Sequence, residues 1–198
     1  MLFNTVWKSQ IMAEININEL TEYCKAFSGL TPEREVLLKE IKEEITPYLA
    51  GVTNAFYAEL EKIEKAKPFL EGKLEGLKKT HGEWLEGIFS DDFDDNYTKH
   101  IYHVGDVHVT IKLPVEFMAG AMAQIQRNLT PILIKLYGDD LPKLEAVTEA
   151  IIAALGFNLQ VMQESYQSSS LSAELEKFLK ITGMSRTLFD NLALAYDI

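Results

Sequence analysis

Four histidines are the residues of this sequence whose type and spacing best suit chemistry: His81, His100, His103 and His108. His81 and His108 fall in phase with the leucines and isoleucines of two amphipathic segments. His100 and His103 form an HxxH pair on the polar side of their helix, where a solvated face is a simpler interpretation than a metal site. Neutral imidazole is a common metal ligand and also a frequent hydrogen-bonded core group. Two inward histidines on separate segments therefore indicate either a metal-containing cofactor or two satisfied core residues.

Bare metal sites of the common kinds do not fit the spacing. A di-iron carboxylate site needs Glu-x-x-His pairs. Lys78 stands three residues before His81, however, and Gly105 stands three residues before His108. A structural zinc site needs further ligands nearby, and the single cysteine, Cys24, lies in a different, N-terminal segment. The sequence thus points away from di-iron and zinc centres.

A flat macrocycle that carries its own metal needs fewer protein ligands. Haem requires one imidazole and a slot lined by apolar side chains. Gly105 lies one turn before His108, where a missing side chain would let a flat ring approach, although a glycine there also suits a close helix crossing. Covalent attachment is excluded because the sequence has no Cys-x-x-Cys-His motif. It also has no P-loop, no dinucleotide-binding glycine motif and no HExxH motif.

Composition sets the class of protein. The chain has 198 residues, of which 47% are hydrophobic and 25% charged, and its formal net charge is −11. These values exclude a disordered chain, a collagen-like fibre and a disulfide miniprotein, and the negative charge argues against nucleic acid as a partner. A single cysteine, no signal peptide and no apolar run of ~20 residues predict a cytoplasmic protein without a membrane span. Residues 1–11 read as an extension, because Met12 opens a more conventional start.

Hydrophobic periodicity predicts an all-α fold of six to eight helices, with no strand alternation and no internal repeat. Thr31-Pro32 and Thr46-Pro47 each resemble a helix start, with a hydroxyl before a first-turn proline. Pro131 predicts a kink, Gln167–Ser170 reads as a linker, and Gly183 interrupts a weaker amphipathic pattern over residues 171–195. The clearer helices are expected over residues 70–88, 96–113, 115–137 and 142–167.

The segment Val104–Pro114, VGDVHVTIKLP, resembles the proximal-helix signature of protoglobins and the globin domains of globin-coupled sensors, which is close to I-x-x-V-H-x-R-I-G-L-x-P. The resemblance implies that His108 binds the iron of non-covalent haem b. Phe56-Tyr57 matches the family's Phe-Tyr pair, whose tyrosine lies over the distal face. Leu77–Thr80 matches a distal segment whose threonine contacts bound ligand.

The sequence departs from this signature at several positions. Thr110 replaces the usual arginine, Lys112 the usual glycine, and Phe117-Met118 the usual aromatic pair. His81 is expected on the distal helix, 27 residues before His108, and the resemblance leaves two roles open for it. It is either a second axial iron ligand or a distal group that hydrogen-bonds bound dioxygen or water. The remaining residues expected to line the haem are Leu77, Val104, Gly105, Phe69 and Trp84, with Tyr57 and Thr80 as polar contacts for bound gas.

The resemblance implies a globin-like helical sandwich with an extra N-terminal helix and long C-terminal helices that form a four-helix bundle in a homodimer. The expected organisation is an N-terminal extension over residues 1–27, a haem-binding sensor domain over 28–167, and a linker or helical tail over 168–198 toward a possible output domain. The expected function is a haem-based sensor of O2, CO, NO or redox state, and not an enzyme. A stand-alone protoglobin-like protein with nitric oxide dioxygenase or peroxidase activity is one alternative, and a haem-free helical dimerisation module is another.

Overall fold

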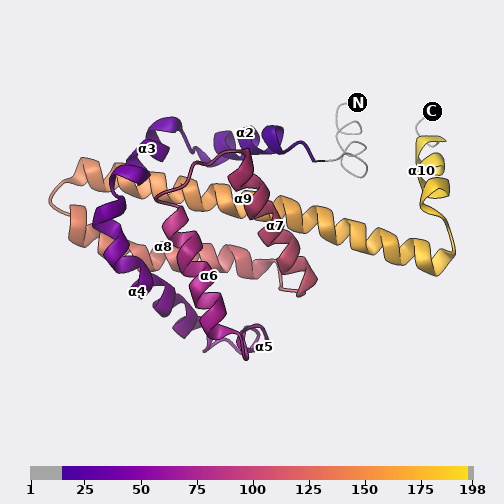
Figure 1. Cartoon of the computed structure of the whole chain (residues 1–198), viewed down its shortest axis with the longest axis horizontal. Coiled ribbons are helices and arrows are strands. Elements are labelled where there is room, and N and C mark those ends of the chain that lie inside the picture. The colour runs from indigo at the N-terminus through magenta and orange to yellow at the C-terminus, as the bar shows by residue number, and fades with distance from the viewer. Residues whose placement is uncertain (1–14, 196–198) are drawn as a thin grey trace.

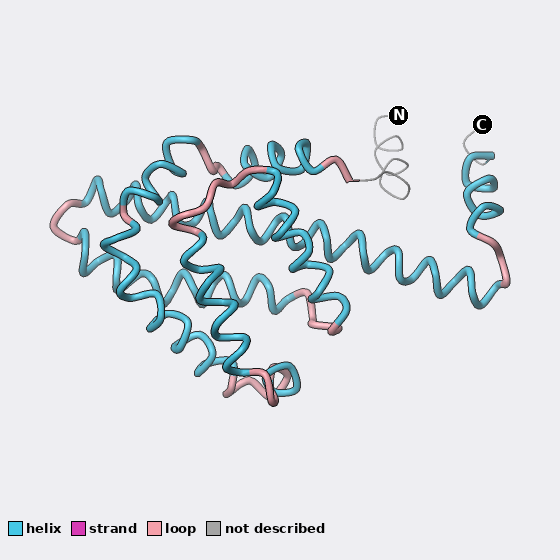
Figure 2. Tube along the Cα trace, viewed as in Figure 1, coloured by secondary structure: helices cyan, strands magenta, loops and turns pink. Residues whose placement is uncertain are grey.

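A computed structural model describes residues 15–195, apart from the side chain of residue 194. Over this range the regular secondary structure is helical, which confirms the predicted all-α class (Figures 1 and 2). The expected extension at residues 1–11 lies outside the described residues. The helices are α2 (Ile17–Ser28), α3 (Pro32–Glu40), α4 (Lys42–Leu60), α5 (Lys67–Leu70), α6 (Leu74–Gly87), α7 (Asp95–Thr110), α8 (Glu116–Tyr137), α9 (Leu141–Thr182) and α10 (Arg186–Ala195).

Side chains that cap helices set several of these boundaries. The Thr31 hydroxyl accepts the backbone N–H of Arg34, and Pro32 occupies the first turn of α3, as predicted. The prediction of a second start at Thr46-Pro47 is wrong, because α4 begins at Lys42 and Pro47 lies inside it. Ile45 and Leu49 flank this proline and are at most 1% exposed. Their burial stabilises the helix across a proline that removes one backbone hydrogen bond.

The prediction of a linker at Gln167–Ser170 is also wrong. Helix α9 continues through it to Thr182 and ends at Gly183, whose φ of 68° is left-handed, so the predicted break at Gly183 is confirmed. The hydroxyls of Ser165 and Ser169 both donate to the Asp106 carboxylate of α7. These serines therefore bond to a neighbouring helix instead of competing for their own backbone.

Helix α9 is the central element. It contacts α2, α3, α7 and α8, whereas α4 contacts α6 and α8. Its C-terminal part extends beyond the other helices to α10 (Figure 1). By length and by a mean hydropathy of 1.3 over 18 residues α9 could span a membrane, but half of that window is buried inside the protein. Val147, Ala154 and Phe157 of α9 are fully buried, which is the arrangement of a core helix.

Candidate functional site

Three aromatic rings surround the side chain of His81 on α6. Phe56 of α4 stacks on the imidazole, with 4.8 Å between ring centroids and 11° between planes. Tyr57 of α4 and Trp84 of α6 lie edge-on to it at 5.7 Å and 5.4 Å. The structure therefore confirms that His81 faces inward, and it brings Tyr57, His81 and Trp84 together.

The two nitrogens of His81 have different surroundings. Nδ1 shares a hydrogen bond of 3.0 Å with the hydroxyl of Thr53, which is buried on α4. Nε2 is buried and has no hydrogen-bond partner. Burial lowers the pKa of His81 from 6.5 to about 4, so the imidazole is neutral at physiological pH. In the tautomer in which Nδ1–H donates to Thr53, Nε2 carries a free lone pair, as a metal ligand requires.

His108 lies near the C-terminal end of α7 and is half-buried. Its Nδ1 is buried without a partner, and burial lowers the pKa of the imidazole. The backbone carbonyl of His108 accepts the N–H of Leu113 at 2.9 Å, which closes the end of the helix. Lys112 stands within this turn with a φ of 58°, the left-handed conformation that glycine adopts most easily. His108 is therefore a neutral imidazole just before a tight helix end.

These two side chains fit haem better than a bare metal ion. Each presents a buried imidazole nitrogen without a partner, and such an unmet group costs about 1–3 kcal/mol. Among residues 15–195, no three or more His, Cys, Asp or Glu side chains are grouped to hold a metal ion. Helix α6 rests on α4, whereas α7 rests on α2 and α9, so the two histidines come from separately supported helices. Neutral imidazoles beside aromatic and aliphatic side chains are the donor set that haem requires.

Some of the other predicted pocket residues lie beside His81, and others lie elsewhere in the core. Tyr57 is buried, which raises its pKa to about 12 and keeps its hydroxyl protonated as a donor. Leu77, Trp84 and Val104 are partly buried against the core. Phe69 of α5 packs edge-on against Phe117 of α8, with 6.1 Å between ring centroids.

Two further expected residues, Thr80 and Gly105, have close contacts within the protein. Thr80 is exposed, and its hydroxyl donates to the Gly76 and Leu77 carbonyls of its own helix, at 3.2 Å each. A Cβ added to Gly105 would lie 2.7 Å from the Met162 carbonyl oxygen of α9. Gly105 therefore serves the close helix crossing that was the other interpretation of this glycine. His100 and His103 are exposed on α7, in agreement with a solvated face.

Sequence reasoning did not find Thr53 and Asn158. Asn158 of α9 is fully buried, and its Oδ1 accepts both the indole N–H of Trp84 and the hydroxyl of Tyr97, at 3.0 Å each. Its Nδ2 donates to the Ala154 carbonyl at 2.8 Å. A lone polar residue within an apolar helix face was the available signal for both residues, but their partners lie far away in sequence.

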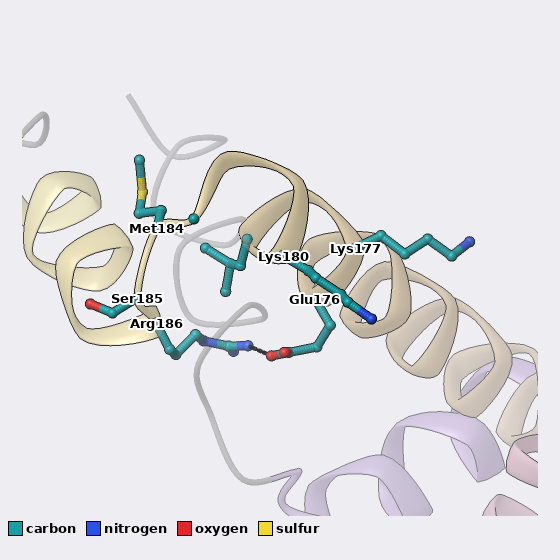
Figure 3. A pocket seen from close by; sticks show the side chains of 8 residues that line it. Glu176, Lys177, Lys180, Met184, Ser185 and Arg186 are labelled. Carbon is teal, nitrogen blue, oxygen red and sulfur yellow. Dashed lines mark hydrogen bonds and ion pairs between the residues drawn. The ribbon is translucent and has the colours of Figure 1, made fainter.

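One hollow lies away from the histidines, where α9 meets α10. It has a volume of about 640 Å³ and is open to solvent, and an ion pair of 2.9 Å joins Arg186 to Glu176 in its lining (Figure 3). A smaller hollow of about 390 Å³ lies between α4 and α8. Neither contains a predicted site residue. The first is lined by Glu176, Lys177, Leu179, Lys180, Gly183, Met184, Ser185 and Arg186.

Comparisons with known proteins match most of the chain. The family model described as Protoglobin matches residues 17–172. The globin domain of a Geobacter sulfurreducens globin-coupled sensor is 25% identical with a TM-score of 0.69, and the similarity covers 74% of this chain and 97% of that one. The globin domain of E. coli DosC in its ferric form is 19% identical with a TM-score of 0.60, covering 73% of this chain and 98% of that one. The ferrous form of the same domain gives 18% identity and a TM-score of 0.59. No curated protein sequence matches the chain.

Proposed function

The chain belongs to the protoglobin family, and we propose that it is a haem-based gas or redox sensor domain in which His108 and His81 would hold the haem iron. Its cofactor is haem b, as in other globin domains of this family. When bound, haem supplies an iron centre that takes diatomic ligands and changes oxidation state. The observation that carries the proposal is the imidazole of His81, whose Nε2 is buried without a partner while Thr53 holds Nδ1.

The protein residues have distinct tasks in this proposal. His108 would supply the proximal imidazole, and the bond from the Leu113 N–H to its backbone carbonyl fixes the helix end that carries it. His81 would supply the distal imidazole, and entry of O2, CO or NO would require that imidazole to move from its contacts with Phe56 and Trp84. The Tyr57 hydroxyl then stands as a protonated donor in the same cluster. A displaceable distal imidazole suits a sensor better than an enzyme with fast turnover.

The proposal is tested by haem uptake and ultraviolet–visible spectra. His108→Ala should abolish uptake, and the full chain should give six-coordinate low-spin bands in both ferric and ferrous states. His103→Ala is the matched control, because His103 lies on the same helix but is exposed. Full retention of haem by His108→Ala with an unchanged spectrum would refute the assignment. A five-coordinate ferrous spectrum of the unaltered chain would remove His81 as a ligand and leave His108 in place.

The sensor function includes a homodimer formed through α8 and α9. Ile134 of α8 and Leu141 and Ile152 of α9 are 56%, 69% and 44% exposed, although each is large and apolar. A four-helix bundle between two copies would cover such side chains. A cytoplasmic location and an output domain beyond the tail belong to the same proposal. Sedimentation should show a dimer, and Ile152→Glu should dissociate it.

A stand-alone protein with nitric oxide dioxygenase or peroxidase activity is the second candidate. The feature that favours it is the Tyr57 hydroxyl, because a donor beside bound dioxygen stabilises the charge that builds on its outer oxygen. Rapid steady-state consumption of nitric oxide or peroxide by the purified haem protein would support this activity. Slow consumption together with six-coordinate spectra would favour the sensor.

A further inference from the structure

We propose that Asn158 is a positioning residue that fixes His81 through Trp84 and so couples occupancy of the distal position to α9. This inference rests on the proposed function, because it takes His81 as the distal ligand. It adds a specific connection between the ligand and the central helix. The connection runs from His81 to Trp84 on α6 and from Trp84 to Asn158 on α9.

Three hydrogen bonds set the orientation of the Asn158 side chain. The residue is 0% exposed, so its polar atoms depend on protein partners. The amide oxygen accepts from Trp84 and Tyr97, and the amide nitrogen donates to the Ala154 carbonyl one turn earlier in α9. These three bonds distinguish the oxygen from the nitrogen and leave one orientation of the amide. Any displacement of α9 at this turn therefore moves the acceptor of the Trp84 indole.

The side chain of Trp84 packs against that of His81. The indole and imidazole centroids are 5.4 Å apart at 61°, while Phe56 stacks on the imidazole at 4.8 Å. The imidazole thus contacts two rings, Phe56, which is buried in the core, and Trp84, whose N–H is hydrogen-bonded to α9. Departure of His81 from the distal position would change its contacts with both rings. Trp84 is the half-buried one, whereas Phe56 is 5% exposed.

Helices α6 and α7 each donate a side-chain hydrogen bond to the same oxygen atom, Oδ1 of Asn158. Tyr97 of α7 donates to the same Oδ1 and packs against Phe93 and Phe157, at centroid distances of 4.8 Å and 6.2 Å. A change in the hydrogen bond from Trp84 to Asn158 therefore also affects the bond from Tyr97, which lies on the same helix as His108. Linkage requires the coupling to act in both directions, so the position of α9 biases His81 as much as His81 biases α9.

The test uses the full chain with bound haem. The variants are Asn158→Leu, which keeps the approximate volume, and Trp84→Phe, which keeps a ring but removes the N–H. Each should change the ratio of six-coordinate to five-coordinate haem by about tenfold, as expected for a group that orients a ligand. The double variant should show no further change, because both substitutions break the same bond. The readouts are low-spin absorption and electron paramagnetic resonance signals, and the rate of CO rebinding after photolysis.

Tyr97→Phe is the matched control. It removes the other donor to the same oxygen but keeps the Trp84 N–H and its acceptor, so it should lower stability and change the ratio less than Asn158→Leu or Trp84→Phe does. Hydrogen exchange around residue 158 should differ between six-coordinate and CO-bound protein, and Trp84→Phe should abolish that difference. If Asn158→Leu folds poorly, Trp84→Phe and the hydrogen-exchange measurement still test the inference.

The outcomes separate this inference from the proposed function. Six-coordinate spectra that neither Asn158→Leu nor Trp84→Phe alters would overturn the inference alone. An equal effect of Tyr97→Phe would overturn it too, because it would show general loosening of the core. A five-coordinate spectrum of the unaltered chain would overturn both the inference and the role of His81. Absence of haem binding would overturn the proposed function as a whole.

Discussion

Thr53 places a buried hydroxyl beside Nδ1 of His81, at 3.0 Å. Thr53→Val keeps the shape of the side chain and removes this partner, so the tautomer with a free Nε2 loses its support. We expect the fraction of six-coordinate haem to fall, with an effect on distal coordination of about tenfold. Ultraviolet–visible titration of the ferric protein measures it. Thr46→Val is the control, because Thr46 lies exposed on the same helix and donates to its own backbone. An unchanged spectrum in Thr53→Val would contradict the role assigned to Thr53.

Lys112 adopts a left-handed conformation, with a φ of 58°, in the turn that follows His108. A side chain in this region crowds its own backbone at a cost of about 1–2 kcal/mol, which glycine avoids. Glycine also gains freedom in the unfolded chain, so Lys112→Gly should raise the free energy of unfolding by a net value of about 0.5–1 kcal/mol. Urea denaturation measures it. Lys112→Ala removes the charge but keeps the strain, and a similar gain in that variant would count against the backbone explanation.

At this scale the sequence predicted the inward histidines but not their partners. His81 and His108 share a phase with apolar neighbours, and periodicity alone is enough to bury them. Thr80 adjoins His81 in sequence, but consecutive helix residues point about 100° apart, and the structure leaves Thr80 exposed. The partner of His81 is Thr53, which lies 28 residues away. Such a contact depends on how α4 packs on α6, which no local pattern contains.

The crossing of α7 and α9 depends on Gly105. A Cβ at this position would lie 2.7 Å from the Met162 carbonyl oxygen and 2.7 Å from the Ser165 Cβ, closer than atoms of that kind approach. Gly105→Ala should therefore lower the free energy of unfolding by about 1–3 kcal/mol, since the two helices must separate. Thermal unfolding of the apoprotein measures the change.

Gly120→Ala provides the matched control for this element. Gly120 lies on α8, and a Cβ added there would meet nothing within 4 Å. Alanine favours helix over glycine, so this variant should gain up to about 1 kcal/mol. If both variants gained stability, the close approach of α7 and α9 would not constrain the fold. A loss of stability in Gly105→Ala together with a gain in Gly120→Ala would support the close crossing of α7 and α9.

Elements were easier to predict than their ends. Thr31, Asp94 and Gly183 mark boundaries through caps that a local sequence specifies. The serine-rich segment after Tyr166 resembled a linker because serine competes with helical backbone when it lacks another partner. Here the partner is Asp106, on a helix about 60 residues earlier, so tertiary contacts override the local preference.

At the scale of the whole molecule, the sequence motif around His108 was sufficient to identify the family, which the match over residues 17–172 confirms. The domain limits set at 28 and 167 remain predictions, although α9 continues as one helix past the second limit. The dimer, the output domain and the physiological gas also remain predictions. They depend on surfaces and affinities that a single chain does not define.

Acid should destabilise the apoprotein through its buried imidazole. The pKa of His81 falls from 6.5 in the unfolded chain to about 4 in the fold, because burial disfavours the charged ring. Between these values the unfolded state binds more protons than the native state, so stability rises with pH across this window and is lost as pH falls through it. The contribution of His81 alone should lower the free energy of unfolding by about 2 kcal/mol between about pH 7 and pH 5. Urea denaturation at these pH values measures it, with His81→Leu as the reference.

The reference variant separates this effect from the other charges of the chain. The pKa values of Glu59 and Asp94 are lowered in the fold. The stability that these two carboxylates contribute is therefore lost below about pH 4.5, outside the range from pH 7 to pH 5. The net charge of −11 acts in the opposite direction, because protonation of carboxylates relieves repulsion in both the unaltered and the variant chain. The difference between the two chains therefore isolates the imidazole. Parallel pH profiles for the two proteins would show that His81 binds protons equally in the folded and unfolded states, which would contradict its burial as a neutral ring.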